Sequence, residues 1–235
     1  MTTDEEHSPR LELSRSLRDH GVSGPAIDGI EALPPAAEAV LGVAFNMLRT
    51  GATPTIAELA EATGLTENAT VGLLDLMGEV GLVEVDANRV VGAGGVTTRT
   101  TRHVLELDGI ALHTWCAIDV FGIPAGLGAD AQATSTCSWC DAPQRVAFVL
   151  GETHPDRAEL RVWLPRLACS HVRSEFCTQA NLFCNEEHLA AWRAQAGHPA
   201  GEALGIADTV ALGRAAFSKY ATPPTRPTPK ENPNP

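Results

Sequence analysis

An ordered series of three capped helical stretches, followed by short strand candidates, most constrains the fold of this chain. From Ala36 onward, apolar residues recur at helical spacing until Gly51 interrupts them. Residues 55–58 (Thr-Ile-Ala-Glu) have the form of a capping box and open a second helix, and Thr66 can cap a third. Two short strands are predicted next, at residues 82–85 and 89–91. This is the element order of a winged-helix unit, which we place at residues 36–100.

A winged-helix unit either binds DNA or serves as a packing module. The third predicted helix, at residues 67–79, carries Glu67, Asp75 and Glu79 and no Lys or Arg. A helix that approaches phosphates needs those basic side chains. The formal net charge of −12 also argues against a large nucleic-acid surface. We therefore expect a packing role for this unit and no nucleic-acid partner.

The remainder of the chain is expected to form short antiparallel strands and a few helices. Asp108-Gly109 is a strong two-residue hairpin signal between strands at 102–107 and 110–113. A short helix is predicted to open at Cys116 and to give way to a loop at 122–128. Further strands are expected at 133–136, 145–150 and 159–164, and further helices at 186–195 and 208–220. The predicted class is α+β, with the winged-helix-like subdomain followed by a mixed α/β catalytic domain at residues 101–220.

The two ends of the chain are predicted to lie outside these units. Residues 1–35 form an N-terminal extension with a helix at 11–20 and a loop rich in Gly and Pro, and the proline-rich tail at 221–235 is expected to be disordered. No apolar run has the length of a membrane span and the first ten residues are polar, so we expect a cytoplasmic protein without a membrane partner. Six cysteines in that compartment favour metal ligation or chemistry over disulfides.

The stretch at residues 114–119, Thr-Trp-Cys-Ala-Ile-Asp, follows the predicted hairpin directly. Cys116 and Asp119 are three residues apart, so on a helix the thiol and the carboxylate share one face. A helix N-terminus favours the thiolate form of a cysteine in the first turn. The pair is therefore a candidate nucleophile beside a proton carrier. The alternative is that Cys116 is a small buried hydrophobic residue.

A second motif lies about sixty residues further on, at residues 171–177 (His-Val-Arg-Ser-Glu-Phe-Cys). With both motifs in this order, the chain resembles the organomercurial lyases (alkylmercury lyases) from about residue 36 to residue 220. The likeness includes residues 103–109, 133–137 and 204–217. Its most specific part is a cysteine, an aspartate three residues later, and a distant cysteine that follows a phenylalanine.

The resemblance implies the activity and the roles of three residues. Cys116 and Cys177 match the two mercury-binding thiols of the family, and Asp119 matches its proton-transferring carboxylate. Soft thiolates bind soft Hg²⁺ in preference to nitrogen or oxygen ligands. The implied reaction is protonolysis of the carbon–mercury bond of an organomercury substrate, giving a hydrocarbon and Hg²⁺ as the bound product, without an organic cofactor. A mercuric reductase is one candidate acceptor of the Hg²⁺. The winged-helix-like region of the family does not bind DNA.

The chain also departs from the family pattern. Thr178 stands where the family often has a second cysteine. Cys137 and Cys140 form a C-x₂-C pair where the family typically keeps the first cysteine only, and Cys184 and His188 are four residues apart at a predicted helix start. These four side chains form a tetrahedral structural zinc site, a regulatory thiol cluster, or an unrelated set of thiols and imidazole.

These additional thiols motivate an alternative function, namely a non-enzymatic thiol- or metal-binding protein, or a metal sensor, on the same scaffold. Of the remaining candidates, Cys169 is expected to pack in the core. His113 and His171 lie near the proposed site in sequence and are expected to be ordinary surface or hydrogen-bonded histidines.

Overall fold

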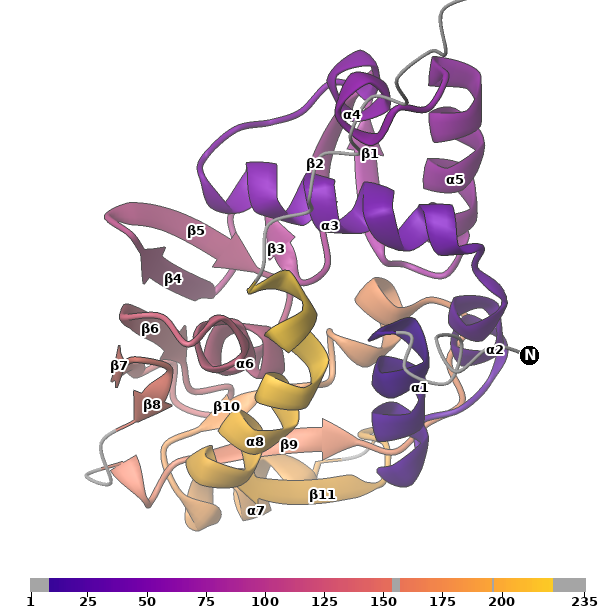
Figure 1. Cartoon of the computed structure of the whole chain (residues 1–235). Helices are drawn as coiled ribbons and strands as arrows, with labels where there is room; N and C mark the ends of the chain where they lie inside the picture. Colours follow the sequence, from indigo (N-terminus) through magenta and orange to yellow (C-terminus); the bar gives the residue numbers. More distant parts are fainter. Residues whose placement is uncertain (1–8, 154–156, 196, 222–235) are drawn as a thin grey trace, which may run out of the picture.

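The computed structural model describes residues 9–153, 157–195 and 197–221 of the chain (Figure 1). The proline-rich tail that the sequence predicts to be disordered lies, from residue 222 onward, outside the described residues. Among the described residues, none of the helices combines the length and the apolar character needed to cross a membrane.

Five helices form the N-terminal part of the fold, drawn in indigo and violet in Figure 1. They are α1 (Pro9–Asp19), α2 (Pro25–Ala32), α3 (Pro35–Arg49), α4 (Ile56–Thr63) and α5 (Glu67–Glu79). The predicted capping box opens α4, because the backbone N–H of Thr55 donates to Glu58 Oε2 at 2.7 Å and that of Glu58 donates to Thr55 Oγ1 at 3.2 Å. Thr66 caps α5 through its side chain, as predicted.

Helix α2 corrects the prediction of a Gly- and Pro-rich loop in the N-terminal extension. Pro25 stands in its first turn, where a missing N–H costs no hydrogen bond. Ile27 and Ile30 are fully buried, so the helix contributes to the core. Gly24, at its N-cap, has a φ of 96°, and a Cβ there would lie 2.9 Å from the backbone of Cys169. The glycine therefore allows α2 to dock against the distant part of the chain, rather than marking a loop.

Eight strands form one antiparallel sheet in the order β1-β2-β3-β5-β4-β6-β7-β8. Their bounds are β1 (Val83–Asp86), β2 (Arg89–Ala93), β3 (Val96–Thr97), β4 (His103–Leu107), β5 (Ile110–Thr114), β6 (Ala131–Thr136), β7 (Pro143–Val149) and β8 (Glu152–Thr153). The hairpin between β4 and β5 turns at Asp108 and Gly109, both with positive φ, as the sequence predicts. β3 lies before residue 100 and β5 after it, and the two strands pair in the same sheet. The domain boundary expected at residue 100 therefore stays a prediction.

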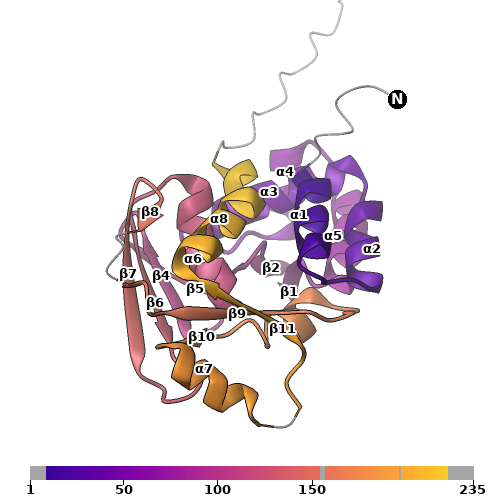
Figure 2. The same cartoon turned by 90° about the horizontal axis from the view of Figure 1, so that it is seen from below.

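A smaller antiparallel sheet, in the order β10-β9-β11, lies in the lower part of the molecule in Figure 1 and is seen from below in Figure 2. Its strands are β10 (Leu182–Phe183), β9 (Arg161–Pro165) and β11 (Gly201–Gly205). Helix α7 (Glu186–Arg193) follows β10, and α8 (Ile206–Phe217) follows β11 and continues into the short 3₁₀ turn η3 (Ser218–Tyr220). The architecture is α+β with antiparallel strands, as predicted.

Helix α6 (Ala117–Leu127) runs through the centre of the molecule, and α8 packs along it (Figure 1). Every residue from 117 to 126 is buried, so the helix is covered by the rest of the fold on all sides, and Asp119 is the one charged residue among them. The loop predicted at residues 122–128 is wrong, because the helix continues through Leu127 and ends at Gly128 in the left-handed conformation. Gly122 faces Gly213 of α8 so closely that a Cβ on either residue would meet the backbone of the other helix. These glycines permit close packing of two helices.

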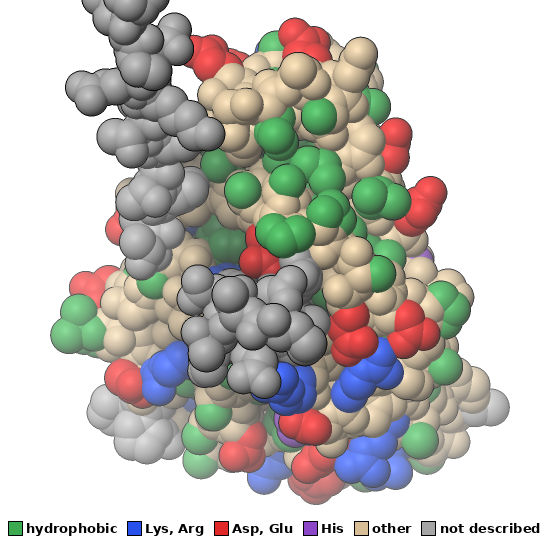
Figure 3. All heavy atoms as spheres, turned by 45° about the vertical axis from the view of Figure 1, so that its right-hand side comes forward, with side chains coloured by type: hydrophobic (Ala, Val, Ile, Leu, Met, Phe, Trp, Pro, Cys, Tyr) green, Lys and Arg blue, Asp and Glu red, His purple; other side chains and the backbone are tan. Residues whose placement is uncertain are grey.

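The surface over α5 has little positive charge. Helix α5 carries no Lys or Arg, and Val71 and Leu76 on it are exposed. Figure 3 shows hydrophobic and acidic side chains on the upper part of this face, with Lys and Arg side chains gathered lower down. This distribution accords with the expectation of no nucleic-acid partner, which stays a prediction, as does the winged-helix assignment.

Candidate active site

Cys116 and Asp119 lie at the start of α6, immediately after β5. Cys116 is the N-cap residue of the helix, with extended backbone, and Asp119 is the third helical residue. The backbone N–H of Cys116 donates to Asp119 Oδ2 at 3.1 Å, and the thiol of Cys116 donates to the same oxygen, also at 3.1 Å. The carboxyl therefore accepts two hydrogen bonds from one residue, in an arrangement like a capping box.

Cys177 reaches this pair from a different element. It ends a five-residue π-helical turn, η2 (Val172–Phe176), and its N–H donates to the Val172 carbonyl at 2.9 Å. Such turns are rare and occur often at functional sites. The N–H of Ala117 donates to the Ala180 carbonyl at 3.1 Å, which ties the segment after Cys177 to the start of α6.

The structure therefore brings Cys116, Asp119 and Cys177 together. The two sulfurs and a carboxylate oxygen all lie within 4.8 Å of one another. All three residues are buried, with exposed fractions of 1 %, 8 % and 5 %.

Burial determines which of these three side chains are protonated near neutral pH. Burial raises the pKa of the Cys116 thiol well above its usual value, and its hydrogen bond with Cys177 raises it further. The expectation that the helix N-terminus favours a Cys116 thiolate is therefore wrong, because burial removes the solvation of the charged sulfur. The hydrogen bond with Cys116 lowers the pKa of Cys177, but burial and the nearby charge of Asp119 leave it raised.

The carboxyl of Asp119 differs from an exposed aspartate. Burial raises its pKa to about 7, although the two hydrogen bonds from Cys116 oppose the shift. Near neutral pH the thiols hold their protons, while Asp119 lies close to the midpoint of its titration. A carboxyl in that state can both accept and donate a proton.

A cavity of about 80 Å³ adjoins the three residues. Asp119 and Cys177 form part of its wall, and α8 supplies Leu212 and Ala216. The rest of the wall is mostly apolar and includes Leu17, Ile30, Leu82, Trp115, Ile118, Val172, Phe176, Phe217 and Tyr220. Because Leu17 and Ile30 belong to α1 and α2, the N-terminal helices help to close the cavity. The space suits a small apolar group next to the carboxyl.

A second, more polar hollow of about 410 Å³ lies beside the first. Trp115 and Cys177 line both, so they separate the apolar cavity from this hollow. His103, also in its wall, is buried, and its ring nitrogen Nδ1 lies 2.8 Å from Ser135 Oγ. Burial lowers the pKa of His103 to about 3, so the imidazole is neutral near pH 7.

Sequence reasoning missed two residues that shape the site. Gly95 has a φ of 97°, and a Cβ there would lie 2.8 Å from Asp119 Oδ1. Tyr220 is buried in the cavity wall, and its ring stacks on Phe45 with centroids 4.2 Å apart. The pair Gly94-Gly95, just before a strand, was the available signal for a close backbone approach. Nothing in the spacing of Tyr220 indicated that it would reach the site.

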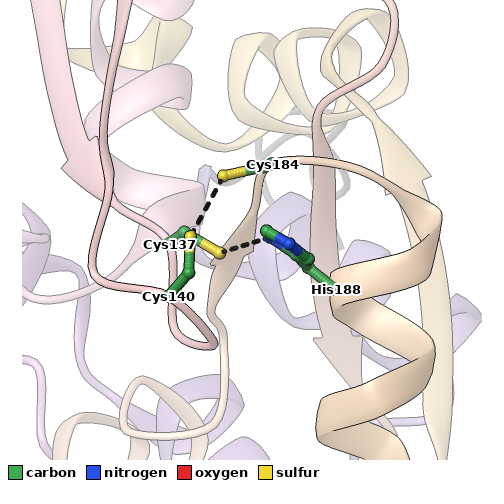
Figure 4. Close-up of side chains that lie close together, drawn as sticks. All are labelled: Cys137, Cys140, Cys184 and His188. Carbon is green, nitrogen blue, oxygen red and sulfur yellow. Dashed lines mark hydrogen bonds between the residues drawn. The ribbon is translucent and has the colours of Figure 1, made fainter.

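The structure also brings together the second predicted set. Donor atoms of Cys137, Cys140, Cys184 and His188 lie within 4.8 Å of one another (Figure 4). Cys169 belongs to neither group and is fully buried in the core, as predicted.

The two histidines that lie near the proposed site in sequence, His113 and His171, are hydrogen-bonded, as predicted. Nδ1 of His113 accepts from the N–H of Thr101, and Nδ1 of His171 accepts from the N–H of Ser174, each at 3.2 Å.

Comparison with known proteins identifies the relatives of this chain. The family model described as "MerB: Alkylmercury lyase" matches residues 96–218. The alkylmercury lyase of Streptomyces lividans is 29 % identical over 186 residues, which cover 78 % of this chain and 84 % of that protein. The alkylmercury lyase of Staphylococcus epidermidis is 30 % identical over 183 residues, which cover 75 % and 80 %.

A solved structure shares the fold. The crystal structure described as the mercury-bound form of MerB2 superposes with a TM-score of 0.75 and 22 % identity, covering 90 % of this chain and all of that one. The class of protein is a lyase that cleaves a bond between carbon and a metal. More narrowly, the chain belongs to the alkylmercury lyase family, and it is an organomercurial lyase that converts organomercury compounds to a hydrocarbon and Hg²⁺. This activity takes the place of the non-enzymatic alternative.

Proposed function

We propose that Cys116, Cys177 and Asp119 perform the carbon–mercury protonolysis, with the two thiols binding mercury and the carboxyl carrying the proton. The close approach of two buried sulfurs and one carboxyl oxygen, all within 4.8 Å, is the observation that carries this proposal. Two sulfurs suit a soft metal that prefers two-sulfur coordination, and the carboxyl lies beside the position of the metal.

The first step exchanges one ligand of the substrate. Cys177 borders the polar hollow, so it meets the incoming R–Hg–X, where X is a small thiolate. Its sulfur forms a bond to mercury, its proton leaves with X as HX, and R–Hg remains bound to Cys177. The organic group R then occupies the apolar cavity, where its burial is favourable.

The second step moves the proton of Cys116. This thiol already donates a hydrogen bond to Asp119 Oδ2, so its proton passes to the carboxylate as its sulfur bonds to mercury. Two sulfur ligands increase the electron density on mercury and weaken its bond to carbon. The carbon departs with the electron pair of that bond and takes the proton from Asp119. The products are R–H, Hg²⁺ held by two thiolates, and the Asp119 carboxylate. No organic cofactor enters these steps.

Hydrocarbon release tests the assignment. Purified protein with excess thiol and methylmercury should release methane, measured by gas chromatography. Cys116→Ser and Cys177→Ser should each abolish release, and Asp119→Ala should bind mercury without releasing methane. Cys169→Ala is the matched control, since Cys169 is a buried cysteine outside the site and its loss should leave turnover in place. Turnover by Cys116→Ser or Cys177→Ser at the wild-type rate would refute the assignment.

We propose that the bound Hg²⁺ passes to the thiols of a mercuric reductase. Thr178 follows Cys177, so the chain offers no second thiol at the neighbouring position, and the acceptor must reach the metal directly. The polar hollow beside Cys177 suits this approach. Because the reaction needs two free thiols, we also place it in the reducing cytoplasm. Release of Hg²⁺ should quicken with rising concentration of an external dithiol, and a rate independent of dithiol would contradict direct transfer.

A further inference from the structure

We propose that three thiols and one imidazole outside the active site bind a structural zinc ion. The ligands are Cys137, Cys140, Cys184 and His188 (Figure 4). The proposed lyase chemistry uses none of them, so this is a second metal centre with a separate role.

The distances fit a tetrahedral ion. Cys140 Sγ and Cys184 Sγ lie 3.6 Å apart, and Cys137 Sγ lies 3.6 Å from His188 Nδ1. Zinc bonds of about 2.3 Å to sulfur and about 2.0 Å to nitrogen separate tetrahedral ligands by about 3.5–3.8 Å. The longest separation in the cluster is under 4.8 Å, so binding requires a contraction of about 1 Å at most. Three sulfurs and one nitrogen, with no open position and no carboxylate, are typical of structural zinc sites.

Backbone hydrogen bonds hold the two halves of the cluster in place. Cys137 and Cys140 lie in the tight turn between β6 and β7, which the hydrogen bond from Cys137 N–H to the Ala142 carbonyl closes at 3.0 Å. The N–H of Ser138 donates to the Leu182 carbonyl at 2.8 Å, which joins this turn to β10.

The other half of the cluster is equally well positioned. His188 lies in the first turn of α7, and its N–H donates to Asn185 Oδ1 at 2.9 Å, which caps the helix. The four ligands therefore stand on elements that are ordered by their own hydrogen bonds.

One of the sulfurs also accepts a hydrogen bond from a residue outside the cluster, as metal-bound thiolates do. Gln144 Nε2 donates to Cys184 Sγ at 3.3 Å. Hydrogen bonds from neighbouring residues to metal-binding side chains orient these side chains and tune their charge.

The position of the cluster explains why a metal would stabilise the fold. The turn with Cys137 belongs to the eight-stranded sheet, whereas Cys184 follows β10 of the three-stranded sheet. The hydrophobic cluster at this junction is small, and its large members are Trp163, Phe183, Leu189 and Trp192. Few buried side chains supply limited stability, and metal ligation commonly adds to it. One ion here would join the two sheets.

The same ion would position the active-site loop. Cys184 follows Cys177 by seven residues, and Asn181 between them accepts a hydrogen bond at 3.0 Å from Ser138 Oγ of the C-x₂-C turn. Zinc would thus hold the segment that begins at Cys177. This positioning role rests on the proposed function of Cys177, whereas zinc binding itself does not.

Metal analysis of the full-length protein tests the proposal without any organomercurial. Wild type, purified after growth with zinc, should contain about one zinc per chain. Cys140→Ser and His188→Ala should lose most of it, whereas Cys169→Ala and the double variant Cys116→Ser/Cys177→Ser should keep it. Wild type without zinc after reconstitution, or zinc lost only with Cys116 and Cys177, would overturn the proposal.

Cobalt substitution of the wild type covers the case in which a ligand variant fails to fold. Co²⁺ should give the intense visible bands of a tetrahedral site and sulfur-to-metal charge transfer, unchanged in Cys116→Ser/Cys177→Ser. A chelator that removes zinc should lower the Tm of wild type. A cobalt spectrum without sulfur charge transfer, or a Cys140–Cys184 disulfide in thiol-reduced protein, would refute the site. Zinc with no hydrocarbon release would contradict the lyase roles alone.

Discussion

Burial of the Asp119 side chain disfavours the charged form of its carboxyl. In the folded protein its pKa is about 7, whereas an exposed aspartate titrates near its usual acidic value. The folded state therefore binds a proton more tightly than the unfolded state. The resulting stability is fully present below the unfolded pKa and is lost as the pH rises through about 7. Near neutral pH, where the reaction uses the Asp119 carboxyl, its burial therefore lowers the free energy of unfolding.

Asp119→Asn should remove that loss of stability. The amide keeps an oxygen for the Cys116 hydrogen bond but cannot ionise. Relative to wild type, the variant should gain stability as the pH rises from about 4 to about 7, by about 1.4 kcal/mol per pH unit, and the difference should stay constant above that range. Urea unfolding of both proteins under reducing conditions measures this difference. Comparing the pair cancels the contribution of His103, whose lowered pKa gives the opposite trend. An equal change with pH in both proteins would show that Asp119 is not buried as described.

Gly95→Ala should impair catalysis more than folding. The new Cβ would lie 2.8 Å from Asp119 Oδ1 and displace the carboxyl. We expect hydrocarbon release to fall by about tenfold or more, equivalent to about 1.4 kcal/mol in the barrier. Gly109→Ala is the matched control, since Gly109 also has a positive φ but has no neighbour within 4 Å of such a Cβ. It should lose some stability and keep turnover, and equal losses of turnover in both variants would contradict a specific contact with Asp119.

At the scale of elements, α6 and α8 form the support of the site. Cys116 and Asp119 stand at the start of α6, and α8 supplies part of the cavity wall. The two helices approach closely because Gly122 and Gly213 face each other. Gly and Pro within an apolar run usually predict a loop. In α6 they instead allow a second helix, distant in sequence, to pack closely, so the segment stays helical.

Gly213→Ala should therefore destabilise the fold. Its Cβ has no room against the backbone of α6, and overpacking in a core costs about 1–3 kcal/mol. Gly72→Ala in α5 is the control, because no atom lies within 4 Å of its Cβ and alanine favours a helix by about 0.5–1 kcal/mol. Urea midpoints should fall for the first variant and rise slightly for the second. Two variants of equal stability would argue against the tight α6–α8 contact.

At the scale of the whole molecule, local patterns predicted much of the fold. The capping box at Thr55, the cap at Thr66 and the hairpin at Asp108-Gly109 are all present, because each depends on neighbouring residues. Helix α2 and the second half of α6 were missed, because their Pro and Gly residues act through contacts with distant segments. The residues of the candidate site were predicted by family order, but their burial was not. That burial reverses the expected thiolate state of Cys116.

The position of mercury after one turnover tests the central claim most directly. A crystal of the wild-type protein, treated with one equivalent of methylmercury and allowed to release methane, should show one mercury atom bound by the sulfurs of Cys116 and Cys177, beside the Asp119 carboxyl. Mercury bound instead at Cys137, Cys140 and Cys184, or held by only one of the two active-site sulfurs after methane has left, would contradict the account.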